Sequence, residues 1–100
     1  MVYHGIELPM EEIADTCRRH HIRRLALFGS ILTDEFRPDS DVDMLVEFDP
    51  GKTPGLEFFS IQRELGALVG RQVDLNTSQD LSRYFRDRVV AEARPLYARD

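Results

Sequence analysis

The chain has 100 residues, of which 42% are hydrophobic and 31% are charged, and its formal charge is −5. This length suits one domain with a thin core, and the acidic balance argues against a protein whose main role is direct binding of nucleic acid. No apolar run approaches the ~18 residues that a membrane-spanning helix needs. We therefore expect neither nucleic acid nor a membrane as a partner.

The single cysteine, Cys17, cannot form a disulfide within the chain, which fits a reducing compartment. The segment from Met1 to Leu8 lacks the basic and then apolar layout of a signal peptide. We expect a cytoplasmic protein. Because so short a chain builds a small core, a protein partner in a homo- or hetero-oligomer would be unsurprising.

Hydrophobic periodicity divides the chain into alternating helices and strands. Pro9 suits the first turn of a helix, and Gly70 suits the residue after a helix. The predicted elements are a helix from Pro9 to about His21, a strand over Leu25–Phe28, a helical turn from Ser30 to about Glu35, a strand over Asp41–Phe48, a helix ending at Val69, a strand over Gln72–Asn76 and a helix from about Leu81 to Ala93.

This order predicts an α/β (α+β) fold with a small mixed sheet of three to four strands flanked by helices. Phe58 and Phe59 are adjacent on a helix, so we expect one of them in the core and the other free for a protein contact. The last helix should bury an apolar side and end before Pro95. That side comprises Phe85, Val89, Val90 and Ala93, and Tyr84 and Tyr97 are expected to be packing residues.

Gly29-Ser30 lies where a predicted strand meets a predicted helical turn. Glycine lets the backbone approach a ligand closely, and free N–H groups at a helix start, together with the Ser30 hydroxyl, suit a phosphate. A turn that merely caps a helix is the alternative.

Asp41 and Asp43 lie two residues apart on a predicted strand and therefore point to the same side. Two close carboxylates repel each other unless a cation lies between them, and Mg²⁺ prefers such oxygen ligands. A solvated loop edge is a plausible alternative for Asp41 and a poorer one for Asp43, which begins an apolar strand.

Asp74 lies inside the short strand Gln72–Asn76, with apolar neighbours on both sides. Taken alone, it reads as an aspartate on an exposed face. If this strand pairs beside the Asp41–Phe48 strand, all three carboxylates line one cleft. Three carboxylates and two metal ions suit in-line displacement at phosphorus, with Asp74 activating the attacking hydroxyl.

The string Gly29-Ser30, ten residues, Asp41-x-Asp43 resembles the signature of the DNA polymerase β-like nucleotidyltransferase superfamily. The length and the tail, with Val73-Asp74-Leu75 before a helix and Leu96-Tyr97, are similar to one branch, the minimal nucleotidyltransferase (MNT) antitoxins encoded beside HEPN-domain ribonuclease toxins. The resemblance covers almost the whole chain. It implies a polymerase β-like fold in a single domain over residues 1–100.

The resemblance also implies roles for individual residues. Gly29 and Ser30, with Ser40 and Arg37 nearby, would bind the nucleotide. Asp41, Asp43 and Asp74 would be both the catalytic residues and the metal ligands. They would hold two Mg²⁺ ions when ATP is bound. The implied activity is transfer of AMP from ATP to a tyrosine of the partner HEPN toxin, which neutralises the toxin.

One stretch departs from the family pattern. Many relatives carry an arginine and a glycine in a form like Gly-Ser-x-Ala-Arg-Gly, whereas this chain has Thr33 and Asp34 there. Arg37 is a candidate substitute, although a solvated loop arginine is an alternative reading. Two other functions therefore stay open: a non-catalytic module that neutralises its partner by binding, and a nucleotidyltransferase that acts on a small molecule.

Overall fold

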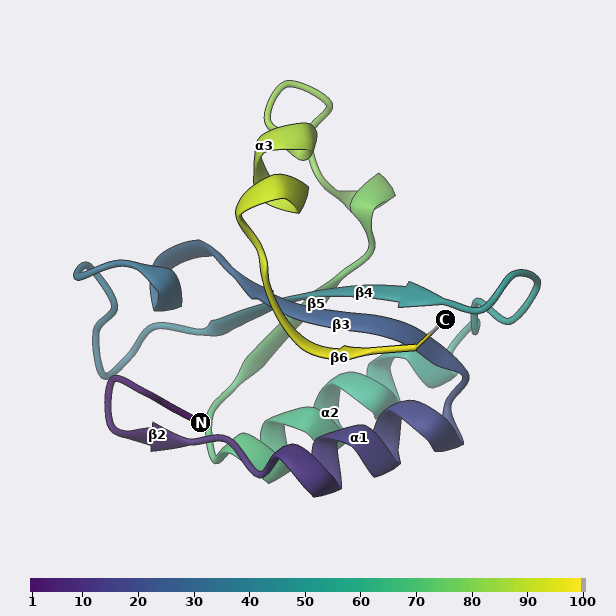
Figure 1. The fold of residues 1–100 in the computed structure, drawn as a ribbon, viewed down its shortest axis with the longest axis horizontal. Coiled ribbons are helices and arrows are strands. Elements are labelled where there is room, and N and C mark those ends of the chain that lie inside the picture. Colours follow the sequence, from purple (N-terminus) through teal and green to yellow (C-terminus); the bar gives the residue numbers. More distant parts are fainter. Residues whose placement is uncertain (100) are drawn as a thin grey trace.

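A four-stranded sheet with the strand order β5-β4-β3-β6 runs through the middle of the molecule (Figure 1). The computed structural model describes residues 1–99. β4 pairs in parallel with β5 and antiparallel with β3, and β3 pairs antiparallel with β6, so the sheet is mixed, as predicted. The strands are β3 (Ile22–Phe28), β4 (Val42–Phe48), β5 (Val73–Asn76) and β6 (Arg94–Ala98).

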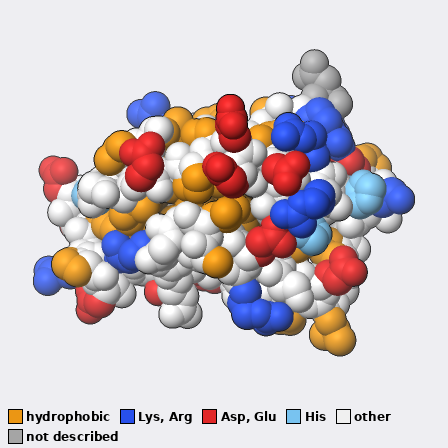
Figure 2. All heavy atoms as spheres, turned by 90° about the horizontal axis from the view of Figure 1, so that it is seen from below, with side chains coloured by type: hydrophobic (Ala, Val, Ile, Leu, Met, Phe, Trp, Pro, Cys, Tyr) orange, Lys and Arg blue, Asp and Glu red, His pale blue; other side chains and the backbone are white. Residues whose placement is uncertain are grey.

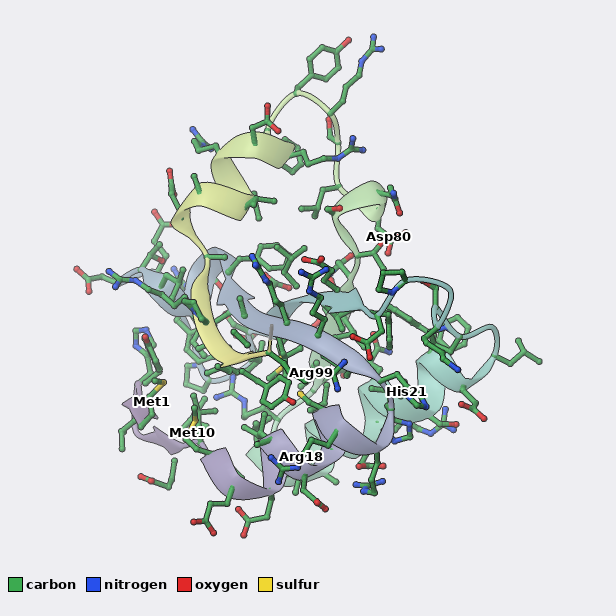
Figure 3. The ribbon with its side chains drawn as sticks, turned by 45° about the vertical axis from the view of Figure 1, so that its right-hand side comes forward. Met1, Met10, Arg18, His21, Asp80 and Arg99 are labelled. Atoms are coloured by element: carbon green, nitrogen blue, oxygen red, sulfur yellow. The ribbon has the colours of Figure 1, made fainter. Side chains whose placement is uncertain are left out.

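Two helices cover one face of the sheet, whereas a short third helix projects from the opposite side (Figure 1). The covering pair is α1 (Met10–Arg19) and α2 (Glu57–Val69). The projecting helix is α3 (Arg86–Glu92), reached from β5 through the 3₁₀ turn η2 (Ser78–Asp80). In Figure 3, Asp80 lies on the side of the sheet that carries α3, and Arg18 lies on the side of α1. We call the face toward α3 the open face.

Alternation along the strands decides which residues are buried. In β4 the buried side chains are Val42, Met44, Val46 and Phe48, and Asp43, Leu45 and Glu47 point to the open face. Beneath the sheet, α1 and α2 contribute an apolar stripe to the same core. The helical part of that core consists of Ile13 and Cys17 from α1 and Ile61, Leu65 and Val69 from α2.

The outer surface of α1 and α2 carries interspersed acidic and basic side chains (Figure 2). Glu64 of α2 is at the centre of one such group: its Oε2 accepts a hydrogen bond of 2.8 Å from Thr16 Oγ1 and contacts the Arg19 guanidinium. His20 Nε2 lies 3.4 Å from the other carboxylate oxygen. These contacts join the two helices and hold the pKa of Glu64 down at about 2, chiefly through the hydrogen bond from Arg19.

The predicted helix over 81–93 is wrong in extent, because only Arg86–Glu92 is helical. A capping box between Thr77 and Asp80 caps the start of η2 instead, and Leu81, which follows η2, is buried. Arg86 Nη2 donates to the Leu81 carbonyl at 2.9 Å, which holds the chain in a bend before α3 begins.

The expectation of a buried apolar side on the last helix is also wrong, since no residue of α3 is buried. Phe85 is 44% exposed, Val90 is 50% exposed and Tyr84, expected to pack, is 86% exposed. Tyr97 packs against the core as predicted. Pro95 lies in β6, an edge strand of the sheet, where a missing N–H donor is tolerated.

The first residues form a hairpin that the sequence patterns did not indicate. It pairs β1 (Val2–Tyr3) with β2 (Ile6–Glu7) through a turn in which His4 and Gly5 both have positive φ. Of the adjacent phenylalanines, Phe58 packs on the core and Phe59 is exposed, as expected. No helix within residues 1–99 has the length and apolar character needed to cross a membrane.

Candidate active site

The turn after β3 begins at Gly29, whose φ of +80° strains any residue with a side chain. A Cβ at this position would collide with Asp43 Oδ2 and lie 3.2 Å from Asp43 Cγ. Glycine therefore meets two requirements at once, a left-handed backbone and close approach to a carboxylate. The 3₁₀ turn η1 (Gly29–Leu32) then starts directly beside Asp43.

Thr33 closes this turn. Its main-chain N–H and its Oγ1 both donate to the Ser30 carbonyl, at 2.9 and 2.8 Å, and Oγ1 accepts from the Glu35 N–H at 3.1 Å. The stretch where relatives often have Arg-Gly is thus ordered here by a hydroxyl. It supplies no cation to the turn, because the next residue is the exposed Asp34.

Pairing of the strands brings the predicted carboxylates onto one face. β4 and β5 are parallel, with Asp43 opposite Asp74, so the two side chains project from neighbouring positions on the open face. Asp41 stands two residues before Asp43 and points the same way. The condition set from the sequence, that the strand of Asp74 must pair beside that of Asp43, is met.

The three carboxylates perturb one another. The pKa of Asp43 is raised to about 6, first by its partial burial, then by the negative charge of Asp74 and then by that of Asp41. Burial and the neighbouring negative charges disfavour the ionised form of Asp43, and a nearby cation would stabilise that form. Asp41 and Asp74 themselves are exposed, so a ligand can reach the cluster.

Arg71 holds the loop that leads into Asp41, and no sequence pattern pointed to it. Its Nη2 donates to the Arg37 carbonyl at 3.0 Å and to the Ser40 carbonyl at 2.7 Å. Its guanidinium also lies 4.8 Å from the centroid of the Phe36 ring, which stacks on His4. An arginine just after a helix is common, and only the tertiary structure shows that this one orders a distant loop.

The loop also contains Ser40 and Arg37, which the sequence predicts to contact the nucleotide, and this role stays a prediction for both residues. The Ser40 hydroxyl accepts a hydrogen bond of 3.0 Å from the Arg37 N–H, which leaves its own proton to donate. The Arg37 side chain is exposed, and its main chain makes the bonds that order the loop. A role for Arg37 in place of the missing arginine stays a prediction.

Two hollows open on this side of the molecule, one on each side of α3. The larger, of about 1130 Å³, includes Gly29, Asp34 and Val89, and we call it the turn hollow. The smaller, of about 530 Å³, includes Ala26 and Val90, and we call it the strand groove. The carboxylates line neither hollow, since they lie between Gly29 and the strand positions that floor the groove.

The carboxylate cluster fits a divalent cation only as an incomplete ligand set. Within residues 1–99, no three His, Cys, Asp or Glu side chains are arranged to enclose a metal ion by themselves. Mg²⁺ usually keeps several waters and takes the remaining ligands from substrate phosphates. The oxygen donors of Asp41, Asp43 and Asp74, open to solvent beside a turn that suits phosphate, match that kind of site.

Comparison with known families agrees with this geometry. The family model described as "Polymerase beta, Nucleotidyltransferase" matches residues 11–100. The chain belongs to this family. In this nucleotidyltransferase domain, the match spans the Gly29 turn and all three carboxylates.

Individual relatives place the domain more closely. The chain is 33% identical over 94 residues to the protein adenylyltransferase MntA of Thermococcus cleftensis, covering 85% of this chain and 93% of the relative. It is 36% identical to a solved structure assigned as a minimal nucleotidyltransferase, with a TM-score of 0.71 and coverage of 86% and 87%. The predicted resemblance to minimal nucleotidyltransferases is confirmed.

A more distant match supports the fold alone. A chain in the structure of a tri-AMPylated Shewanella oneidensis HEPN toxin in complex with MNT antitoxin is 20% identical, with a TM-score of 0.63. The match covers 90% of this chain and 70% of that chain.

Proposed function

We propose that this chain is an antitoxin that transfers AMP from ATP to a tyrosine hydroxyl of a HEPN ribonuclease toxin and thereby neutralises it. The observation that carries the proposal is the meeting of Gly29, Asp43 and Asp74 where β3 ends and β4 and β5 begin. The 33% identity to a protein adenylyltransferase supports the reaction. The partner is proposed from the HEPN toxin of the Shewanella oneidensis complex, in which one chain shares this fold.

In this mechanism the η1 turn positions the triphosphate of ATP. Gly29 leaves room for the phosphates to approach the backbone, and the Ser30 hydroxyl and nearby N–H groups donate hydrogen bonds to them. Asp41 and Asp43, with Asp74, would hold Mg²⁺, which when bound neutralises the phosphate charge. The chain would contribute chiefly by holding ATP and the acceptor hydroxyl in the geometry that the reaction needs.

Asp74 faces the acceptor. Its carboxylate accepts the proton of the tyrosine hydroxyl as the phenolic oxygen forms a bond to the α-phosphorus. The bond from the α-phosphorus to the oxygen that bridges to the β-phosphate breaks, and pyrophosphate leaves with that electron pair. The products are the AMP ester of the tyrosine, pyrophosphate and one proton.

The test is incubation of the purified chain with its cognate HEPN toxin, Mg²⁺ and labelled ATP, followed by intact-mass measurement of the toxin. We expect one or more AMP additions from the wild type. Asp41→Asn, Asp43→Asn and Asp74→Asn should each reduce the rate by at least a hundredfold. Asp39→Asn, an exposed loop aspartate next to the site, is the matched control and should transfer normally.

Two outcomes would replace the proposal. A tight complex with the toxin that carries no label would select a neutraliser that acts by binding alone, for which the absence of the family arginine near Ser30 is the supporting observation. Transfer to an added small-molecule acceptor with no transfer to the toxin would select the other class of nucleotidyltransferase.

A further inference from the structure

The open face of the sheet is built in rows across the strands. The first row holds the carboxylates Asp43 and Asp74. The second row is uncharged and follows from the register, which places Ala26 opposite both Leu45 and Pro95. Because successive rows are two residues apart along a strand, their separation is about 6.7 Å. An uncharged floor therefore adjoins the carboxylates directly.

The strand groove lies over this second row. Ala26, Leu45 and Pro95 form its floor, and Val90 and Ala93 form the wall toward α3. Val90 is 50% exposed and α3 buries none of its residues, so this wall is an apolar surface left uncovered in the isolated chain.

The in-line geometry of the transfer reaction indicates which reactant the strand groove would bind. The turn at Gly29 lies past the first row on one side, and Ala26 lies past it on the other, because β3 runs through Ala26 and Phe28 into the turn. With the triphosphate at the turn, pyrophosphate leaves toward Gly29. The attacking oxygen must then approach from the opposite side, which is the side of the strand groove.

The charged residues at the far end of the strand groove bear on the charge of the segment that would bind there. Arg23 lies 3.8 Å from Glu47, and Arg99 contacts Asp49. Arg24, which lines the groove in the third row, has no carboxylate within 4.0 Å among residues 1–99. Glu47, the other charged residue that lines the groove, lies beside Arg23, so among residues 1–99 the Arg24 guanidinium remains available to an acidic group of a partner.

We infer that the strand groove is the acceptor site, and that it takes an extended segment of the partner protein carrying a tyrosine with acidic residues on one side. The tyrosine ring lies on Ala26 and Leu45 and directs its hydroxyl toward Asp74. The acidic residues meet Arg24 two rows away, about 13 Å along the strands, where the three aspartates cannot repel them. The inference rests on the proposed function and specifies its substrate.

The test varies the groove without touching the nucleotide site. Ala26→Leu fills the floor, and Arg24→Glu reverses the charge at the far end. Ala67→Leu, an exposed position on α2 on the other face, is the matched control. For each variant, the affinity for AMP-PNP with Mg²⁺, the affinity for the cognate HEPN toxin and the rate of AMP transfer at saturating ATP are measured. Circular dichroism verifies the fold.

We expect both groove variants to weaken binding of the toxin at least fivefold and to lower kcat/KM for the toxin at least tenfold. Affinity for AMP-PNP should stay within twofold of wild type, and Ala67→Leu should behave as wild type. If Ala26→Leu fails to fold, Val90→Trp narrows the same groove from an exposed position and carries the same expectation.

Each contrary result has a distinct meaning. Loss of AMP-PNP binding in Ala26→Leu would assign the groove to the nucleoside and overturn the inference. Unchanged toxin binding and AMP transfer in both groove variants would show that the acceptor binds elsewhere, and would also overturn the inference. Failure of the wild type to label the toxin would overturn the proposed function, while toxin affinity, which needs no transfer, would still decide the groove.

Discussion

The Gly29 backbone and the Asp43 carboxylate pack so closely that no side chain fits between them. β3 ends in register with Asp43, since Phe28 pairs with it, and the next residue turns at a φ of +80°. The pairing of these two strands thereby holds together the turn that we propose binds phosphate and a carboxylate that we propose binds the metal ion.

Gly29→Ala tests this packing. The added Cβ must displace the Asp43 carboxylate, so we expect loss of AMP-PNP affinity and of transfer, with a fall in the free energy of unfolding of about 2–3 kcal/mol. Gly51→Ala is the control, because Gly51 has a φ of +78° and a Cβ there would meet no atom within 4 Å. It should lose only about 1 kcal/mol and keep transfer; equal losses would contradict the role of the contact.

Asp43→Asn should stabilise the metal-free protein. The folded-state pKa of about 6 lies above the ordinary value of 3.8, so the folded state binds a proton more readily than the unfolded state. Stability from this group therefore falls as pH rises through 6. After allowance for solvent exposure we expect a gain of about 1 kcal/mol for the variant at pH 8 in EDTA, shrinking toward pH 5 in thermal melts. Destabilisation at pH 8 would count against crowding of the carboxylates.

Glu64→Gln should give the opposite pH dependence. The pKa of Glu64 is lowered to about 2, chiefly by the hydrogen bond from Arg19, so its contribution is present at neutral pH and lost as pH falls from about 4.5 toward 2. We expect the variant to be about 1 kcal/mol less stable at pH 7, a value reduced for solvent screening. The difference from wild type should vanish near pH 2, and a difference that persists there would refute this account.

Arg71→Lys should loosen the loop before Asp41. A lysine cannot hold the Arg37 and Ser40 carbonyls with one planar group while stacking on Phe36. We expect AMP-PNP affinity to fall about five- to tenfold and proteolysis within residues 36–40 to quicken, with the melting temperature changed by only a few degrees. Arg63→Lys is the control, because among residues 1–99 the Arg63 side chain hydrogen-bonds only the Ser60 hydroxyl on its own helix.

Much of the site could be predicted from the sequence because its determinants are local. Alternation along one strand places Asp41 and Asp43 on the same side, and the glycine before Ser30 marks a turn that needs a left-handed backbone. The apolar residues around Asp74 identified its strand. The extent of the last helix was not predictable in this way, since the Thr77–Asp80 capping box and the Arg86 hydrogen bond outweigh the helical periodicity of 81–85.

The sequence by itself determined the types of residue in the site and the face of each strand on which they stand, because side-chain direction follows backbone periods of 2 and 3.6 residues. Only the tertiary structure decided that Asp74 stands beside Asp43, that Arg71 orders the loop over residues 36–40, and that α3 leaves a groove beside the carboxylates. Strand order and register depend on contacts between distant segments, and local patterns carry no information about which segments meet.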